Sequence, residues 1–237
     1  MTRESPQYFY ENIAERFEGL DHVDDVRRRL SIVFDECLAG TGLAGTRMLD
    51  AGCGYGAFSD AAVKRGAAVV SLDIGERLVA RTMARAGSRG LVANVCQLAV
   101  RDQSFDVVIS SEMLEHTEAP EKAIKELARV LRADGLLVLT TPNRLWQGVV
   151  RAASWLRLRP FRGLETFVAW RRLEQSCAAA GLEVLIHTGF HPWPFQLGLN
   201  SAARIVERHL ARGPAARLMV NQAVVARKRS VERRPRP

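Results

Sequence analysis

The stretch MLDAGCGYGAFSD, residues 48–60, holds three glycines at alternate positions, Gly52, Gly54 and Gly56. An apolar run that ends in Asp50 precedes them, and a helix-like segment follows. Glycine lets a backbone turn sharply and leaves room where a Cβ would collide with a bound molecule. The stretch therefore predicts a tight turn from a strand into a helix, with its backbone close to a ligand.

Short apolar runs alternate with helical patterns after this turn. Continuous apolar strands between helices indicate a parallel sheet covered on both faces, so an α/β fold is expected. The predicted strands are 47–51, 67–73, 91–95, 105–111, 135–141, 182–188 and 218–227. Helices are predicted over 57–65, 75–86, 119–132, 170–181 and 201–211, and residues 6–39 also read as helical from their apolar spacing.

The glycine turn lies at the carboxyl end of its strand, which is where parallel sheets bind their ligands. Asp73 closes the next strand, where an acid can accept hydrogen bonds from both hydroxyls of a ribose. An adenosine-type ligand follows from this pair of features. The turn also fits the G-x-G-x-x-A fingerprint of dinucleotide-binding proteins, which leaves an NAD(P)-dependent oxidoreductase open. A phosphate-binding P-loop is excluded, because no Gly-Lys-Ser/Thr follows.

Three segments together narrow the ligand further. LDAGCGYG (49–56), VVSLDIG (69–75) and the block from Gln103 to Asn143 that contains SFDVVISSEMLEH resemble motifs of the class I S-adenosylmethionine-dependent methyltransferases. The EMLEH wording is most similar to the methyltransferase type 11-like branch that includes ubiquinone-biosynthesis O-methyltransferases. The resemblance implies a Rossmann-like, seven-stranded, mostly parallel sheet with helices on both faces, plus N-terminal helices and a helical lid insertion.

The resemblance also implies a cofactor, S-adenosyl-L-methionine, which leaves as S-adenosylhomocysteine, and a set of residues around it. The glycine turn would lie along the methionine part, Asp50 near its amino group, and Asp73 at the ribose. Asn94 stands where the family often has an acid, and its amide oxygen can still accept from the adenine amino group. The implied cofactor-binding residues are Asp50, Gly52, Cys53, Gly54, Gly56, Asp73, Ile74, Asn94, Val95, Ser111 and Glu112.

Two histidines are candidates for catalysis. Transfer to a hydroxyl of high pKa needs a base, and histidine titrates in the right range. His116 follows the fourth strand at the ligand edge, although it could equally brace the next segment. His191, and His187 beside it, reach the same edge if their strand is parallel to the others. No metal site is indicated, because the four cysteines are far apart and form no CxxC pair.

The segment 144–162 interleaves tryptophans and aliphatic residues with five arginines and no acid. Such a segment suits an anionic membrane surface or a lipid-like substrate, and it equally suits a lid helix with solvated arginines. A peripheral membrane contact through 144–162 is therefore one expectation. Tyr10 in the N-terminal region, Trp146 in this segment and Trp193 in the irregular stretch 189–200 are the candidate substrate-binding residues.

Charge and composition set the remaining bounds. The formal net charge of +8 comes from 144–162 and from the tail 227–237, so the rest of the chain is close to neutral. A general nucleic-acid-binding domain is therefore not indicated. The N-terminus has no apolar core of a signal peptide, so a cytoplasmic protein is expected. Oligomeric state cannot be inferred from the sequence.

The expected organisation has three parts. They are a helical N-terminal cap over 1–40, a methyltransferase domain over 41–228 with lid or substrate elaborations at 142–165 and 189–211, and a basic disordered tail over 229–237.

The predicted function is methyl transfer to a small-molecule acceptor, at an oxygen of an aromatic, quinone-like or lipid-linked substrate. Nitrogen, carbon or sugar-oxygen acceptors, a nucleic-acid methyltransferase that uses the basic segments, and a non-catalytic cofactor-binding protein remain alternatives.

Overall fold

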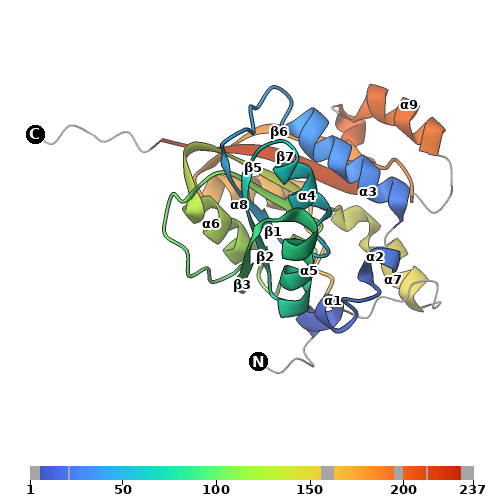
Figure 1. Ribbon diagram of the computed structural model, residues 1–237. Helices are drawn as coiled ribbons and strands as arrows, with labels where there is room; N and C mark the ends of the chain where they lie inside the picture. Colours follow the sequence, from blue (N-terminus) through green and yellow to red (C-terminus); the bar gives the residue numbers. More distant parts are fainter. Residues whose placement is uncertain (1–5, 21, 156–162, 195–199, 212, 231–237) are drawn as a thin grey trace, which may run out of the picture.

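The computed structural model describes residues 6–20, 22–155, 163–194, 200–211 and 213–230. Its centre is a seven-stranded sheet in the order β3-β2-β1-β4-β5-β7-β6 (Figure 1). Neighbouring strands are parallel except that β7 runs antiparallel to both β5 and β6, so β6 points the same way as the other strands. The strands are β1 (Arg47–Ala51), β2 (Ala68–Asp73), β3 (Arg89–Val92), β4 (Phe105–Ser111), β5 (Leu131–Pro142), β6 (Leu182–Phe190) and β7 (Asn221–Lys228).

Helices cover both faces of this sheet (Figure 1). One face packs against α6 (Pro120–Val130) and α8 (Trp170–Ala179). The other packs against α4 (Ala57–Val63) and the π-helical turn η2 (Ser31–Cys37), which continues α3 (Val23–Leu30). The remaining α-helices are α1 (Phe9–Asn12), α2 (Phe17–Leu20), α5 (Glu76–Ala86), α7 (Gln147–Trp155) and α9 (Asn200–Leu210). Short 3-10 turns are η1 (Pro6–Tyr8), η3 (Leu114–His116), η4 (Arg144–Trp146) and η6 (Pro214–Leu218).

The two-sided cover explains the unbroken apolar strands. Met48 and Leu49 are consecutive residues of β1 and both are fully buried, but Met48 packs in the α4 layer and Leu49 in the α6 layer. Side chains alternate across a strand, so a strand buried on both faces must be apolar at every position. Val107 and Val108 of β4 divide between the two layers in the same way.

The N-terminal region differs from the single helical stretch predicted over 6–39. The chain forms only short helices before α3, because residues 9–20 fold over the ligand edge of the sheet instead of running straight. Ile32, Val33 and Phe34 then join the core of the sheet. The second half of the expected N-terminal cap is therefore part of the main domain.

Several strand boundaries differ from the predicted ones, among them the end of β3 and the start of β5. β3 ends at Val92, not at residue 95, because the Asn94 Oδ1 accepts a hydrogen bond from the Cys96 backbone N–H at 2.9 Å and turns the chain. β5 begins at Leu131, where helix 119–132 was predicted to continue, because Leu131 pairs with Phe105 of β4. The expected disordered tail falls mainly on 231–237, outside the described residues.

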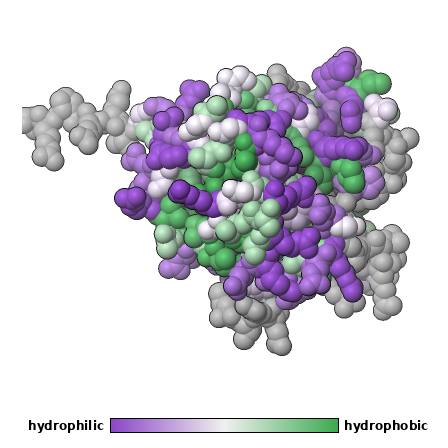
Figure 2. All heavy atoms as spheres, in the orientation of Figure 1, coloured by the Kyte–Doolittle hydropathy of each residue, from purple (hydrophilic) through white to green (hydrophobic). Residues whose placement is uncertain are grey.

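Hydrophilic residues predominate on the face shown in Figure 2, with a hydrophobic area near the place where β3 and α6 lie in Figure 1. Among the described residues, no helix has both the length and the apolar character needed to cross a membrane.

Candidate active site

A cavity of about 650 Å³ lies at the carboxyl edge of the sheet. The ends of β1, β2 and β4 form its inner wall, while residues from α1, α2, α3 and α7 close it from outside. Of the sequence-predicted site residues, the following line it: Tyr10, Gly52, Cys53, Gly54, Asp73, Ile74, Asn94, Val95, Ser111, Glu112, His116 and Trp146. Asp50, Gly56, His191 and Trp193 do not.

The glycine turn has the conformation that its sequence requires. Gly52, Gly54 and Gly56 have φ angles of 82°, 53° and 93°, in the left-handed region that favours glycine. The backbone N–H groups of Gly52 and Cys53 both donate to the Leu72 carbonyl, which ties the turn to β2. A Cβ on Gly52 would lie 2.4 Å from the Met113 Cγ, so the turn has no room for a larger residue there.

Asp73 stands beside this turn at the end of β2. Its Oδ2 accepts from the Gly54 N–H at 3.1 Å and its Oδ1 from the Gly75 N–H at 3.0 Å. Burial raises the pKa of the Asp73 carboxyl, while these backbone hydrogen bonds oppose the rise. Each carboxylate oxygen keeps a lone pair, so the side chain fits the two hydroxyls of a ribose.

Asp50 is buried beneath the cavity and does not line it. It is 2% exposed, and its Oδ2 accepts from the Ser59 hydroxyl at 2.6 Å. Burial is the main cause that raises the pKa of Asp50 to about 7. The side chain therefore braces the start of α4 below the glycine turn, and direct contact with a cofactor amino group, as the resemblance implied, is not supported by its position.

The loop after β3 supplies an apolar slot. Ala93 and Val95 of this loop line the cavity beside Asn94, together with Ile74, which follows β2. The Asn94 oxygen that was expected to meet an adenine amino group already accepts from Cys96 in the structure. The aliphatic side chains give this part of the cavity an apolar surface.

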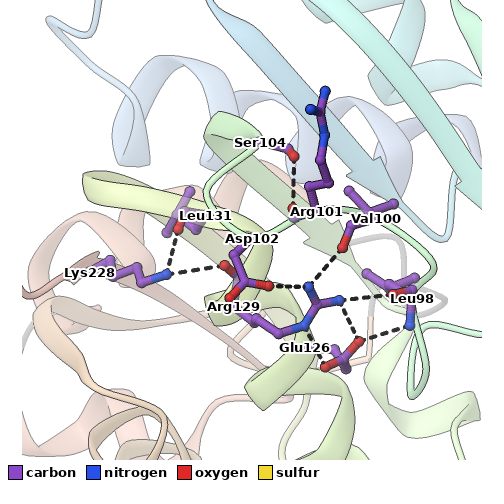
Figure 3. A network of polar contacts seen from close by, with 9 residues as sticks. All are labelled: Leu98, Val100, Arg101, Asp102, Ser104, Glu126, Arg129, Leu131 and Lys228. Carbon is purple, nitrogen blue, oxygen red and sulfur yellow. Dashed lines mark hydrogen bonds and ion pairs between the residues drawn. The ribbon is translucent and has the colours of Figure 1, made fainter.

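A network of hydrogen bonds and ion pairs around Arg129 holds this loop in place (Figure 3). The Arg129 guanidinium donates to the carbonyls of Leu98 and Val100 and to the carboxylates of Asp102 and Glu126. Glu126 in turn accepts from the Leu98 N–H at 2.8 Å. These acids raise the pKa of Arg129. The hydrogen bonds of its guanidinium to the carbonyls of Leu98 and Val100 fix the loop to α6.

An N-terminal strap, residues 8–20, crosses the opening of the cavity. The buried Glu11 carboxylate accepts from the Arg77 and Leu78 N–H groups in the first turn of α5, whose N-cap residue is a glycine without a capping side chain. Arg81 donates to the Ala14 carbonyl and Arg85 to Glu18, both at 2.7 Å. Three arginines spaced one turn apart on α5 thus fasten the strap over the cofactor side.

The strap brings Tyr10 and Phe17 onto the cavity. The centroids of their rings lie 4.4 Å apart, and a Cβ added to Gly54 would touch the Phe17 ring. The Tyr10 hydroxyl lies 3.4 Å from the His116 Nε2. The sequence predicted Tyr10 at this site but not Glu11 or Phe17. The sequence alone does not show which residues of the strap contact α5 or the glycine turn.

His116 is anchored by its other ring nitrogen, since Nδ1 lies 2.7 Å from the Leu164 carbonyl oxygen. Beside it, the Glu115 Oε1 is 3.9 Å from the His116 Nε2. Glu115 is buried, its Oε2 accepts from the Thr141 hydroxyl, and burial is the main cause that raises its pKa to about 7.

The floor of the acceptor half carries further ionisable groups. Asp25 and Arg29 of α3 form a 2.7 Å ion pair across one helical turn, and both line the cavity. Glu112, whose φ of 52° is unusual for a residue other than glycine, accepts from the Asn221 side chain at 2.8 Å. Sequence reasoning missed Asp25, Arg29, Glu115 and Asn221, although EMLEH contains Glu115 next to His116.

The expected role of His191 in catalysis does not agree with its position. The direction of β6 is as expected, but the His191 ring lies behind the cavity wall, 6% exposed, with Nδ1 3.4 Å from the Asn221 Oδ1. Burial lowers its pKa. His187 is also structural, because its ring stacks on Trp170 and its nitrogens contact Glu174 and Gln222.

Trp193 does not line the cavity, although its neighbour Pro194 does. The geometry therefore gives no support for a direct role of Trp193 in substrate binding.

Trp146 at the end of η4 and Val149, Val150 and Ala153 of α7 line the cavity, so this segment presents one face to it. The Trp146 Nε1 donates to the Leu218 carbonyl at 2.9 Å, which anchors the start of this segment. The geometry supports the lid interpretation. Residues 156–162 lie outside the described part of the chain, so the membrane contact proposed for 144–162 stays a prediction.

The strand order, the glycine turn and the ribose-side acid together define a Rossmann-like enzyme that binds a nucleoside cofactor. Comparisons with known proteins point to one family. The family described as "Methyltransferase domain" matches residues 49–139. A ubiquinone biosynthesis O-methyltransferase from Rhizobium etli is 32% identical over 187 residues, which cover 73% of this chain and 75% of the relative. One from Azoarcus sp. is 31% identical and covers 74% and 78%.

Solved structures share the fold. A methyltransferase from Thermotoga maritima, described as a possible histamine N-methyltransferase, has a TM-score of 0.69 at 19% identity and covers 94% of this chain and 100% of its own. Magnesium protoporphyrin IX methyltransferase from Synechocystis, with bound S-adenosylhomocysteine, has a TM-score of 0.66 at 19% identity and covers 94% and 97%.

The chain belongs to the class I S-adenosylmethionine-dependent methyltransferases. Its cofactor is S-adenosyl-L-methionine, so the NAD(P)-dependent alternative is rejected. Asp73, the glycine turn and the side chains of Ile74 and Val95 line the cavity in the places where the resemblance puts the ribose, methionine and adenine parts.

Proposed function

We propose that the enzyme methylates a hydroxyl oxygen of a small aromatic, quinone-like or lipid-linked acceptor, with His116 as the base. The names of the relatives support an oxygen acceptor. The observation that carries the proposal is the pair of contacts that fixes the His116 ring between the Leu164 carbonyl and the Tyr10 hydroxyl. The alternatives are acceptors at nitrogen, carbon or sugar oxygen, and nucleic acids. No contact in the structure favours any of them in the way that the two contacts of His116 favour a hydroxyl.

The first contact sets the tautomer of His116. A carbonyl oxygen only accepts, so the Nδ1 that lies 2.7 Å from Leu164 must carry the proton. In the neutral ring, Nε2 then carries the lone pair that accepts from the Tyr10 hydroxyl 3.4 Å away, and a bound acceptor hydroxyl would take the place of this contact. An acceptor hydroxyl in that space can give its proton to Nε2 as its oxygen forms the new bond to carbon.

Bound S-adenosyl-L-methionine supplies a methyl group already activated by the sulfonium charge. The chain has to align the acceptor, exclude water and take up one proton. The strap and α7 close the cavity from two sides. After proton uptake, His116 is an imidazolium, and an ionised Glu115 carboxylate 3.9 Å away stabilises it.

The experiment uses methyl-labelled S-adenosyl-L-methionine with a whole cell extract, followed by separation of small molecules from nucleic acid and mass spectrometry of the labelled products. An O-methylated product supports the proposal, while label confined to nucleic acid or to nitrogen contradicts it.

His116→Asn separates the base from its anchor, because an asparagine amide can still donate to the Leu164 carbonyl but is not a base. Loss of a general base should lower kcat by roughly 10²- to 10⁴-fold. Binding of S-adenosylhomocysteine should not change. Tyr10→Phe is the matched control and should retain most activity. Full activity in His116→Asn would exclude His116 as the base.

A further inference from the structure

Residues 163–168 form a short segment beside the turn η3, which carries His116. Two backbone groups of this segment reach consecutive residues of the turn. The Leu164 carbonyl oxygen lies 2.7 Å from the His116 Nδ1, and the Thr166 N–H donates to the Glu115 carbonyl, also at 2.7 Å. The segment therefore contacts both the ring of His116 and the main chain beside it.

The far end of the segment is anchored without help from His116. Val168 is buried in the core and forms a parallel bridge with Asn143, at the end of β5. Its carbonyl accepts from the Gln222 side chain of β7 at 2.7 Å. Thr166 thus lies two residues from a point that is fixed to the sheet, and its N–H is held in a defined place.

The side chains of the segment alternate in direction. Glu165 and Phe167 line the cavity, whereas Thr166 between them is exposed. Such alternation is typical of extended backbone. The Thr166 side chain therefore points away from the site, and only its main chain acts on the turn.

The turn η3 cannot fix the His116 ring by itself. Its own hydrogen bond joins the His116 N–H to the Met113 carbonyl, which leaves the Glu115 carbonyl to find a donor outside the turn. A neutral imidazole can carry its proton on either nitrogen, so an outside contact has to select one of them. The Leu164 carbonyl makes that selection only while the turn stays in register with it.

We infer that Thr166 is a positioning residue for methyl transfer. Its N–H holds the Glu115 carbonyl and so keeps the turn η3 in register with the Leu164 carbonyl. His116 then stays in the tautomer whose lone pair is on Nε2, the atom proposed to take up the proton of the acceptor. The inference rests on the proposed function and adds the contact that keeps the base ready.

Two variants at one position isolate this N–H. Thr166→Pro removes it, and the extended backbone before it is the conformation that a following proline requires. Thr166→Ala retains the N–H and is the matched control, since the threonine side chain is exposed. Both are compared with the wild type as full-length enzyme saturated with S-adenosylhomocysteine, and the Kd for this ligand should be the same in all three.

The first readout is nitrogen NMR of isotope-labelled histidine at alkaline pH, where a histidine ring is neutral. His116→Asn identifies the signals of His116. In the wild type and in Thr166→Ala, Nδ1 should carry the proton. In Thr166→Pro, the ring should exchange between its two tautomers, so the shifts of its two nitrogens should move toward each other. A wild-type ring with its proton on Nε2, or unchanged shifts in Thr166→Pro, would overturn the inference.

The second readout is the rate of methyl transfer from labelled S-adenosyl-L-methionine to a whole cell extract. Thr166→Pro should lower this rate about tenfold or more, because part of the general-base contribution is lost. A tautomer change without a loss of rate would support the positioning of the ring and count against His116 as the base. A loss of rate without a tautomer change would overturn the inference.

A second variant covers the case in which Thr166→Pro does not bind S-adenosylhomocysteine. Phe167→Ala keeps every backbone donor of the segment but removes a buried side chain that seats it. The same exchange between tautomers is expected in the His116 ring. Unchanged His116 signals in Phe167→Ala would then overturn the inference.

Discussion

The cofactor half and the acceptor half of the cavity are built in different ways. The cofactor half consists of three consecutive strand ends, and its ligand-facing groups are mostly backbone, glycine and one acid. The acceptor half gathers side chains from α1, α3, α7 and β7, which are far apart in the sequence. The cofactor half is therefore built by a local sequence motif, while the acceptor half is a tertiary assembly.

The two halves meet at the connection from β4 to β5. Glu112 follows β4 in a left-handed conformation, and Glu115 and His116 follow within one turn. The strap also touches both halves, since Glu11 holds the start of α5 and Tyr10 reaches His116. The variants below test whether the halves can be changed separately.

Gly52→Ala should have the largest effect. The new Cβ meets Met113 at 2.4 Å, and φ is 82°. Left-handed strain and overpacking should together cost about 2–5 kcal/mol of unfolding free energy. Urea unfolding measures the loss, and binding of S-adenosylhomocysteine should become undetectable. Gly148→Ala in α7, with open space around the Cβ, is the control and should not destabilise. A stable Gly52→Ala that binds normally would refute the packed turn.

Asp73→Ala should weaken S-adenosylhomocysteine by roughly 5- to 150-fold, because charge-assisted hydrogen bonds are worth about 1–3 kcal/mol. Asp73→Asn should lose less, since an amide oxygen still accepts from one backbone N–H. Calorimetry measures both. Asp60→Ala, which breaks only an exposed pair with Lys64, is the control. Acceptor KM at saturating cofactor should change little, and a large change there would contradict the separation of the halves.

Glu11→Ala should affect both halves. It removes the acceptor for two N–H groups in the first turn of α5, a capping contact worth about 0.5–2 kcal/mol. The strap should then open more often, so cofactor Kd and acceptor KM should both rise severalfold. Steady-state kinetics and calorimetry together show this. An effect confined to thermal stability would mean that the strap plays no part in binding.

Trp146→Phe should have the smallest effect and should be confined to the acceptor half. It removes the hydrogen bond to the Leu218 carbonyl, worth about 0.5–1.5 kcal/mol net, and retains an aromatic ring. Acceptor KM should rise about two- to tenfold while cofactor Kd stays constant. Trp155→Phe, whose tryptophan is 82% exposed, is the control. An increase in cofactor Kd for Trp146→Phe would show that the lid also closes the donor side.

The sequence predicted the strand, glycine turn and helix of the cofactor half because these signals are local. Strand, glycine turn and helix follow one another within 48–60, and Asp73 comes one strand later. The acceptor half was predicted only in part. His116 and Tyr10 line the cavity, but His191 lies behind it, because a strand direction places a residue at an edge without saying which way its side chain points.

The sequence by itself determined the fold, the family and the cofactor, since periodic apolar burial and a glycine turn depend on neighbours within a few residues. Only the tertiary structure decided what the acceptor meets. It brought Asp25 and Arg29 from α3 to Glu112 and Glu115, fastened the strap with the arginines of α5, and fixed His116 against Leu164. Such contacts join residues up to a hundred positions apart, and their energies depend on distance and burial in space, which sequence spacing does not encode.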